Sequence, residues 1–488
     1  MSASIAISVP ATGFPCRRPK RVGAASPFEG FVSMHHSDFT AFLDGFNRLA
    51  KLDLDLGDAS CPETAMARLR GYRAHIAAGP EVTESIAHQI ALLTFVNIAS
   101  RFALGGVTVS GIADVPLLAP WHGDSLASAV EMLGGATADL AEETPVVLLG
   151  SATTPAERGG CQITFAGWRG GVVPLGGSRL DEKETVAAAA VLAGSLAAAE
   201  IFAMLRDEIG AGCRDHGLSI WRPDGDEDWR SPASDGPPVS VLPNHLWVLG
   251  LGHLGQAFLW TLAMSPYSDR ASVKLVLQDT DVVTGSTAST SILTRPETTG
   301  RKTRTVAALL ENLGFATSII ERPFDGAFSR RSDDPSVLIC GVDNALARTQ
   351  LELPRFELVI EAGIGRTASD FRAVRLHSFP SQRAAAELWK AGAAAGVATA
   401  GNMPGYQRLR ESGVDDCGLA LLAGTAVGAP FVGGVAGALM FGQILKLLHG
   451  ERPDAVVDLD LRALEARRAV PSSVPLVHNP GFQPCDNC

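Results

Sequence analysis

A chain of 488 residues is long enough for two or three domains, and its 46% of apolar residues can fill large cores. The formal net charge of −11 argues against nucleic acid or an anionic membrane as the main partner. Its eight cysteines are mostly isolated, which is typical of reduced thiols. The first residues lack the charge order of a secretory signal, so we expect a cytoplasmic protein.

The first half contains strand-like pieces, such as "GGVTVSGI", "TPVVLLGSA" and "CQITFAGW", but no glycine-rich phosphate loop follows them. It ends in an alanine-rich apolar helix whose sequence is echoed 243 positions later. Ala193-Gly194-Ser195-Leu196 matches Ala436-Gly437-Ala438-Leu439. Because this offset is about half the chain, the echo predicts two related halves that pack as a pseudo-symmetric pair.

The boundary falls in "WRPDGDEDWRSPASDGPPVS", which is rich in Pro, Asp, Gly and Ser and has no periodicity. We therefore expect domains at 1–235 and 236–488. The uncharged stretch 417–445 is long enough to cross a bilayer, but it holds Pro430 and seven glycines. A loop that leads into a helix buried against a sheet explains the same residues, and we favour that alternative.

The second half alternates strand-like and helix-like segments, which indicates a mostly parallel, doubly wound sheet. It opens with "HLWVLGLGHLGQAFLWTL", in which Gly250, Gly252 and Gly255 follow a strand and begin a helix. Such a loop lets the backbone approach a phosphate at the helix N-terminus. Asp279 ends the next strand, where an acidic residue usually binds a ribose hydroxyl.

Further charged residues distinguish this site from that of a simple dehydrogenase. Asp281 adds a second carboxylate, and Lys302 and Arg304 start a helix where a cation can reach triphosphate oxygens. "ICGVDNALAR" places Asp343 and Asn344 at the end of a strand, where a carboxylate can hold Mg²⁺. The alternative for Asp343 is that it simply caps the following helix.

In this order, these residues resemble the ubiquitin-activating-enzyme superfamily, which includes the adenylyltransferases of thiamine and molybdopterin synthesis. The similarity covers about Leu246 to Cys488 and includes the helix "FVGGVAGALMFGQILKLLHG" and the end "HNPGFQPCDNC". The first half is similar only to the catalytically silent half of eukaryotic activating enzymes. Bacterial members with two fused halves occur in ubiquitin-like conjugation operons used in antiviral defence, and these are the nearest match.

The resemblance implies an α/β fold of two Rossmann-like doubly wound halves, an inactive N-terminal half and a nucleotide-binding C-terminal half with a crossover loop at about 381–416. It also implies ATP and Mg²⁺, a ubiquitin-like protein as partner, and a conjugating enzyme. The chain would adenylate the partner's C-terminal carboxylate, as a monomer or a homodimer. The implied nucleotide-binding set is Gly250, Gly252, Gly255, Asp279, Asp281, Lys302, Asp343 and Asn344, with Asp343 on the metal.

The sequence departs from the family pattern in three ways. Where the family has an "N-x-x-R" stretch, this chain has the uncharged "GSTASTSIL", and its lysine lies one place too early, so Lys302 and Arg304 compete for one role. Only Cys485 and Cys488 form a CxxC pair, so a four-cysteine zinc site is not expected. A trans-acting arginine is not evident in the first half, where position alone suggests Arg68, Arg70, Arg73 and Arg101.

Activating enzymes that pass the acyl group onward need a cysteine near the crossover loop, and Cys417 is the candidate. A helix N-terminus would lower the pKa of its thiol, whereas Asp415 and Asp416 would raise it. The alternative is a small buried residue. For the whole chain, the alternatives are a catalytically silent ATP-binding or partner-docking scaffold and an NAD-dependent oxidoreductase.

Overall fold

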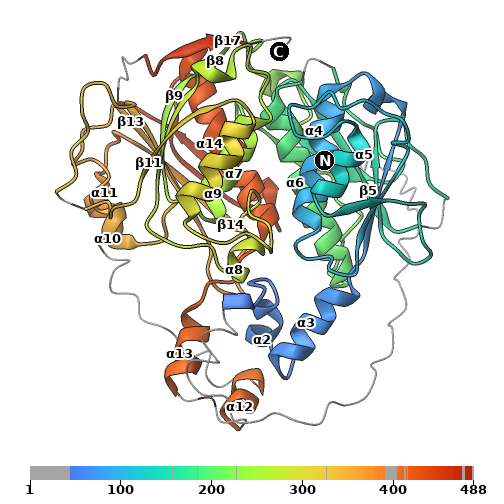
Figure 1. Cartoon of the computed structure of the whole chain (residues 1–488). Coiled ribbons are helices and arrows are strands. Elements are labelled where there is room, and N and C mark those ends of the chain that lie inside the picture. Colours follow the sequence, from blue (N-terminus) through green and yellow to red (C-terminus); the bar gives the residue numbers. More distant parts are fainter. Residues whose placement is uncertain are drawn as a thin grey trace, which may run out of the picture.

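The computed structural model describes residues 44–155, 158–183, 185–226, 228–325, 327–390, 404–411, 414, 416–474 and 479–485. Two β-sheets lie on opposite sides of a central layer of helices, and a smaller group of helices lies at one end of the molecule (Figure 1). Each sheet belongs to one half of the chain.

The first sheet has seven strands in the order β3-β2-β1-β4-β5-β6-β7. Strands β1 to β5 run parallel, whereas β6 and β7 are antiparallel to their neighbours. The bounds are β1 Ala74–Ala78, β2 Val107–Ser110, β3 Gly135–Thr137, β4 Val146–Leu149, β5 Gly160–Ala166, β6 Arg169–Pro174 and β7 His216–Ser219.

The second sheet has eight strands in the order β11-β10-β9-β12-β13-β14-β15-β16. The first five are parallel and the last three antiparallel. The bounds are β9 His245–Leu249, β10 Lys274–Gln278, β11 Ala316–Ile320, β12 Val337–Cys340, β13 Leu358–Ile364, β14 Ala373–Phe379, β15 Asp454–Asp460 and β16 Arg468–Pro471; β8 Val241–Pro243 and β17 Phe482–Pro484 pair separately.

The two sheets share one topology, because strands 3-2-1-4-5-6-7 of the first correspond in order to β11-β10-β9-β12-β13-β14-β15 of the second. The pairing registers of the two sheets agree as well. Ala78, the last residue of β1, lies opposite Leu149, the last of β4. In the same way Leu249, the last residue of β9, lies opposite Cys340, the last of β12. The α/β class and the two Rossmann-like halves are therefore confirmed, while the inactivity of the first half stays a prediction.

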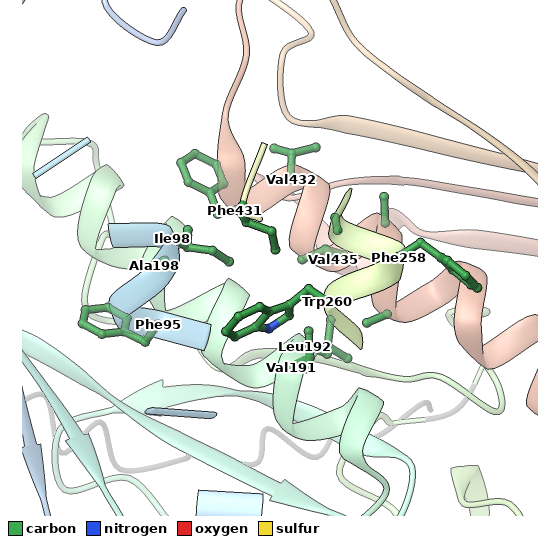
Figure 2. Packing of buried hydrophobic residues seen from close by; sticks show 14 of the residues in the cluster. Phe95, Ile98, Val191, Leu192, Ala198, Phe258, Trp260, Phe431, Val432 and Val435 are labelled. Carbon is green, nitrogen blue, oxygen red and sulfur yellow. The ribbon is translucent and has the colours of Figure 1, made fainter. Parts of the chain in front are cut away.

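Four apolar helices fill the space between the sheets: α4 (Ile86–Ala99), α6 (Ala187–Leu205), α7 (His253–Ala263) and α14 (Pro430–Leu448). Helix α14 contacts α6 and α7 extensively, and α6 packs on α4. Side chains from all four helices meet in one continuous cluster, with Trp260 of α7 between Phe95 of α4 and Val435 of α14 (Figure 2). The Trp260 indole N–H donates to Thr94 Oγ1 across the two halves, 3.0 Å away.

Small residues allow these helices to approach closely. A Cβ on Gly194 of α6 would lie 2.5 Å from Ala91 O of α4, and one on Gly437 of α14 would lie 2.5 Å from Ala257 of α7. The two glycines of the predicted repeat thus make equivalent contacts, each with the first α-helix after the first strand of its own half's sheet. Both long helices are apolar enough to cross a membrane, yet 83% and 89% of their most apolar windows are buried inside the protein.

The stretch 221–240 is tied to the first half rather than extended. Trp221 packs on Trp168 with ring centroids 5.0 Å apart, and Asp235 accepts from Trp168 N–H at 2.7 Å and pairs with Arg169 at 2.9 Å. The remaining helices are α2 Lys51–Leu56, α3 Pro62–Gly71, α5 Leu126–Met132, α8 Gly285–Ala288, α9 Lys302–Asn312, α10 Ala345–Arg348, α11 Ala385–Trp389, α12 Pro404–Glu411 and α13 Asp416–Gly424.

The smaller group of helices at one end of the molecule, α2, α3, α12 and α13, is called the end lobe. It joins the predicted crossover segment to the beginning of the described chain. Helices α12 and α13 lie beside α2 and α3 there (Figure 1). Tyr406 of α12 is fully buried, and its hydroxyl donates to Asp55 of α2 at 2.7 Å. Residues 391–403 of the crossover segment lie outside the described residues.

Candidate nucleotide site

The glycine loop connects β9 to α7 and leaves an open space in front of the helix. Gly250 has a φ of +85°, and a Cβ there would lie 3.0 Å from Val342 N. A Cβ on Gly255 would lie 1.9 Å from Gly250 O, so only glycine fits. A Cβ on Gly252, the N-cap of α7, would meet nothing within 4 Å, so the loop offers its backbone to a ligand such as a phosphate.

Asp279 directly follows β10 and holds the glycine loop from the side. Its Oδ2 accepts from Leu251 N–H at 2.6 Å, and its Oδ1 accepts from Asp281 N–H at 2.8 Å. The carboxylate is partly exposed and lies at the edge of the loop. This is the position from which the corresponding residue of a Rossmann fold reaches a ribose hydroxyl.

Lys302 and Asp281 form an ion pair beside the loop, with Lys302 Nζ 2.7 Å from Asp281 Oδ2. The Lys302 side chain is only 13% exposed, whereas Asp281 is 63% exposed. The backbone supports the pair, since Lys302 N–H donates to Asp281 O at 3.1 Å. A cation at the first position of α9 is therefore held close to the nucleotide-binding edge.

Arg304, the competitor of Lys302, is held elsewhere. Its guanidinium pairs with Glu321 just after β11, with Nε 2.9 Å from Oε1 and Nη2 3.0 Å from Oε2. Arg304 is 69% exposed, and hydrogen bonds and the charge of Glu321 raise its pKa. The geometry thus favours Lys302 for the phosphate-neutralising role, which stays a prediction.

Asp343 and Asn344 follow β12, and only Asn344 caps the next helix. Asn344 is the N-cap of α10, since its Oδ1 accepts from Leu346 N–H at 2.9 Å and Ala347 N–H at 3.3 Å. The structure therefore contradicts the alternative in which Asp343 caps this helix. Asp343 is exposed, and among the described residues no hydrogen bond or ion pair engages its carboxylate. It remains available to a metal ion.

Arg48, from the first half, also lies near this site, since its charge acts on His253 in the glycine loop, and no motif in the sequence points to it. The backbone N–H of Arg48 donates to Ser289 Oγ at 3.2 Å. A Cβ on Gly428 would lie 3.3 Å from the Cβ of Arg48. Burial lowers the pKa of the Arg48 guanidinium, the charge of Asp343 opposes this effect, and Arg366 adds to it. Within the described ranges, no hydrogen bond or ion pair holds this guanidinium.

The four arginines suggested by position lie elsewhere. Arg101 is 6% exposed and donates to backbone oxygens of the segment 288–294 of the second half, namely Ala288, Ile292 and Thr294. Arg68 pairs with Asp53 and Asp58, Arg73 donates to Gly105 O, and Arg70 lies exposed on α3. Arg68, Arg73 and Arg101 thus have structural partners.

Arg101 explains how the uncharged stretch 285–293 keeps its shape. The guanidinium lies among the carbonyl oxygens of this stretch, and Asn97 Oδ1 accepts from its Nη2 at 2.9 Å. Burial, with a smaller contribution from Arg295, lowers the Arg101 pKa to about 9. The first half therefore holds the segment 288–294 with Arg101 and contributes a second arginine, Arg48, that feels the charge of Asp343.

Comparison with known proteins assigns both halves to one family. Residues 73–220 match the model of the BilD N-terminal domain, and residues 242–451 match the model of the BilD C-terminal domain. The chain is 43% identical over 412 residues to the bacterial E1-like protein BilD of Collimonas sp. (strain OK412), covering 83% of this chain and 88% of that protein.

The chain belongs to the BilD family of bacterial E1-like proteins. It is thus a two-part bacterial E1-like protein, as the resemblance of its motifs indicated. Among solved structures, TcdA (CsdL) is similar over 42% of this chain and 86% of its own, with 13% identity and a TM-score of 0.27.

The cysteines of this BilD-family chain differ in burial. Cys340 is fully buried, and burial together with Glu361 raises its pKa to about 12. Cys161 is also buried, and its pKa is raised for the same reason with Glu200 as neighbour. Cys417 is the second residue of α13, but its side chain lies outside the described part of the chain, as does Cys488.

The described residues fit a nucleotide with its magnesium ion. Among them no three His, Cys, Asp or Glu side chains gather as a metal site. One free carboxylate, Asp343, suits Mg²⁺, which is commonly held by one or two carboxylates together with substrate phosphates. Lys302, which pairs with Asp281, and Arg48, which feels the charge of Asp343, bring positive charge close to the carboxylates of this site.

Proposed function

We propose that this chain uses ATP to adenylate the C-terminal carboxylate of a ubiquitin-like protein. The observation that carries the proposal is the convergence of Gly252, Asp279, Lys302 and Asp343 at one edge of the second sheet, with Arg48 added from the first half. Membership of a bacterial E1-like family supports it.

In the reaction, a carboxylate oxygen of the partner attacks the α-phosphorus of ATP. The bond from that phosphorus to the bridging oxygen breaks, and pyrophosphate leaves with the bonding electron pair. Chemistry of this kind depends mainly on positioning and on neutralising charge. Bound Mg²⁺ would supply further charge neutralisation at the phosphates.

The residues of this chain would divide the work. The backbone from Gly250 to Gly255 would bind phosphate oxygens, and Asp279 would orient the ribose. Lys302 would leave Asp281 for the phosphates, since a triphosphate carries more negative charge than one carboxylate. Arg48 would act as the trans-acting arginine and take the place of the cation that the stretch 285–293 lacks.

The direct test is ATP–pyrophosphate exchange that depends on the ubiquitin-like partner. The wild-type chain should exchange label only with ATP, magnesium and the partner present. Asp343→Ala should abolish exchange and leave thermal unfolding unchanged, because the Asp343 side chain has no partner within the described residues. Exchange as fast as in the wild type would show that the metal assignment is wrong.

A catalytically silent scaffold is the second candidate, and the missing "N-x-x-R" stretch favours it. Such a scaffold would bind the partner, with or without ATP, and would give no exchange even in the wild type. Because binding is measured separately by calorimetry, the two candidates give different results. Conjugation in antiviral defence and transfer to a conjugating enzyme would follow only from the enzymatic candidate.

A further inference from the structure

Gln256 is a polar side chain that is buried in the core directly after the glycine loop. It is the fourth residue of α7, and it is fully buried. Its Nε2 donates to Leu251 O at 2.8 Å, and its Oε1 accepts from Leu293 N–H at 2.9 Å. A carbonyl on one side and an N–H on the other define which end of the amide faces which way. Gln256 therefore ties the glycine loop to the end of the uncharged stretch.

The hydrogen bond to Leu251 O sets the direction of one peptide group in the loop. The peptide between Leu251 and Gly252 is trans. In a trans peptide the C=O and the N–H point in opposite directions. Because the Leu251 carbonyl points into the core towards Gln256, the Gly252 N–H points away from the core. A Cβ on Gly252 would meet nothing within 4 Å, so there is room here for an anion that accepts from this N–H.

Glycine at position 252 makes a support of this kind necessary. Without a Cβ, Gly252 accepts either sign of φ, so the peptide could turn over and present the Leu251 carbonyl instead. A carbonyl oxygen repels a phosphate, whereas an N–H binds it. The turned peptide would leave one hydrogen of Gln256 Nε2 buried without an acceptor, which costs free energy. Gln256 therefore favours the orientation that suits an anion.

The first half holds the other side of this support. The Thr294 hydroxyl lies 2.8 Å from Gln256 Nε2 and 3.1 Å from its Oε1, and Thr294 is fully buried. The Thr294 carbonyl accepts from Arg101 at 3.0 Å, and Ile292 O accepts from Asn97 Nδ2 at 3.0 Å. Asn97 lies in α4 and Arg101 directly after it. A chain of buried hydrogen bonds thus connects the glycine loop to α4 of the first half.

We propose that Gln256 is a positioning residue for the nucleotide, which holds the Leu251–Gly252 peptide with its N–H towards the phosphates. Its support comes from the first half, which thereby contributes to the shape of the phosphate loop. The inference rests on the proposed function, because it takes ATP as the ligand of the second half. It concerns binding and not the later chemistry, so a silent scaffold that binds ATP would use Gln256 in the same way.

Gln256→Met in the full chain tests the inference, because it removes both ends of the amide and nearly keeps the volume of the side chain. The loop peptide is then free to turn, and ATP has to order it on binding. The affinity for ATP, measured by calorimetry, should fall by about tenfold.

The matched control is Gln443→Met, the same substitution at another fully buried glutamine. Gln443 binds Asp454 through both ends of its amide. A Cβ on Gly433 would lie 2.4 Å from His253 of the loop, and Gln443 is ten residues further along α14, roughly 15 Å away. Gln443→Met should therefore lower the Tm and keep the wild-type affinity for ATP.

Equal affinities for ATP in Gln256→Met and Gln443→Met would overturn the inference, because Gln256 would then only fill the core. Failure of the proposed function gives a different result, namely a wild-type chain that binds ATP but shows no partner-dependent exchange of pyrophosphate. A wild-type chain that binds no ATP would overturn both proposals.

Thr294→Val and Thr294→Ser provide a second measurement if Gln256→Met does not fold. Valine removes the hydroxyl beside the Gln256 amide and leaves the bonds of Gln256 to Leu251 and Leu293 in place. The affinity for ATP should fall by about threefold in Thr294→Val, the effect of one buried hydrogen bond. It should return to the wild-type value in Thr294→Ser, which keeps the hydroxyl. Equal affinities in these two variants would contradict the role of the support.

Discussion

Lys302 Nζ lies 2.7 Å from Asp281 Oδ2, whereas Arg304 two residues further on is bound to Glu321. Lys302 is thus bound to the segment after β10, which also holds the glycine loop, whereas Arg304 is bound to the residue that follows β11. This division explains how a lysine one place earlier than in the family pattern can still serve the site.

Lys302→Ala is expected to slow partner-dependent ATP–pyrophosphate exchange by about 100-fold, the usual cost of losing one preorganised charge. Arg304→Ala is the matched control and should stay within about threefold of the wild type, because its exposed guanidinium is already paired with Glu321. The reverse order of effects would assign the phosphate contact to Arg304.

Arg48→Ala tests whether the first half contributes to the chemistry. Exchange is expected to fall by about 100-fold, with little change in Tm, since no hydrogen bond or ion pair holds this guanidinium in the part of the chain that the structure describes. Arg70→Ala on the exposed surface of α3 is the control. Full exchange in Arg48→Ala would remove this residue from the mechanism.

Arg101→Met should act on stability instead. The substitution leaves the carbonyl oxygens of Ala288 and Thr294 without their buried donor, and Ile292 O keeps only Asn97 Nδ2, so the free energy of unfolding should fall by roughly 3 kcal/mol. Chemical denaturation measures this cost. The half-exposed Arg68 offers a comparison, because Arg68→Ala should cost less than about 1 kcal/mol. Equal costs would contradict the anchoring role of Arg101.

The local elements of the second half were predictable because each carries its own pattern. The strand before Gly250, the position of Asp279 and the helix from Lys302 follow from short stretches of apolar residues, glycines and charges. Strand β14, by contrast, was not predicted. Its sequence mixes apolar and polar residues, and it pairs antiparallel with β13, the preceding strand, and with β15, a segment distant in the sequence.

The position of Arg48 was not predictable for a related reason. It precedes a short helix in a segment without a motif, and it reaches the site only because the first half folds back on the second.

His216 should make the stability of the two-half assembly depend on pH. Burial, with a contribution from Arg214, lowers its pKa from 6.5 to about 4, and its Nε2 accepts from Leu464 N–H of the second half at 3.3 Å. Because the unfolded chain takes up the proton first, stability should be constant above pH 6.5 and fall as the pH drops towards 4. Thermal unfolding of His216→Gln should show a shallower decline; an identical slope would exclude His216 as its source.

A thioester on Cys417 is the last prediction. Helix α13 begins at Asp416, so Cys417 lies in its first turn, next to the segment expected to cross over the site. Cys340 and Cys161 are poor candidates because burial raises the pKa of both thiols, and only the thiolate is a good nucleophile. A non-reducing gel after incubation with ATP and the ubiquitin-like partner should show an adduct that a thiol reagent removes. The adduct should be lost in Cys417→Ala and kept in Cys340→Ala; an adduct that survives in Cys417→Ala would exclude Cys417 as the acceptor.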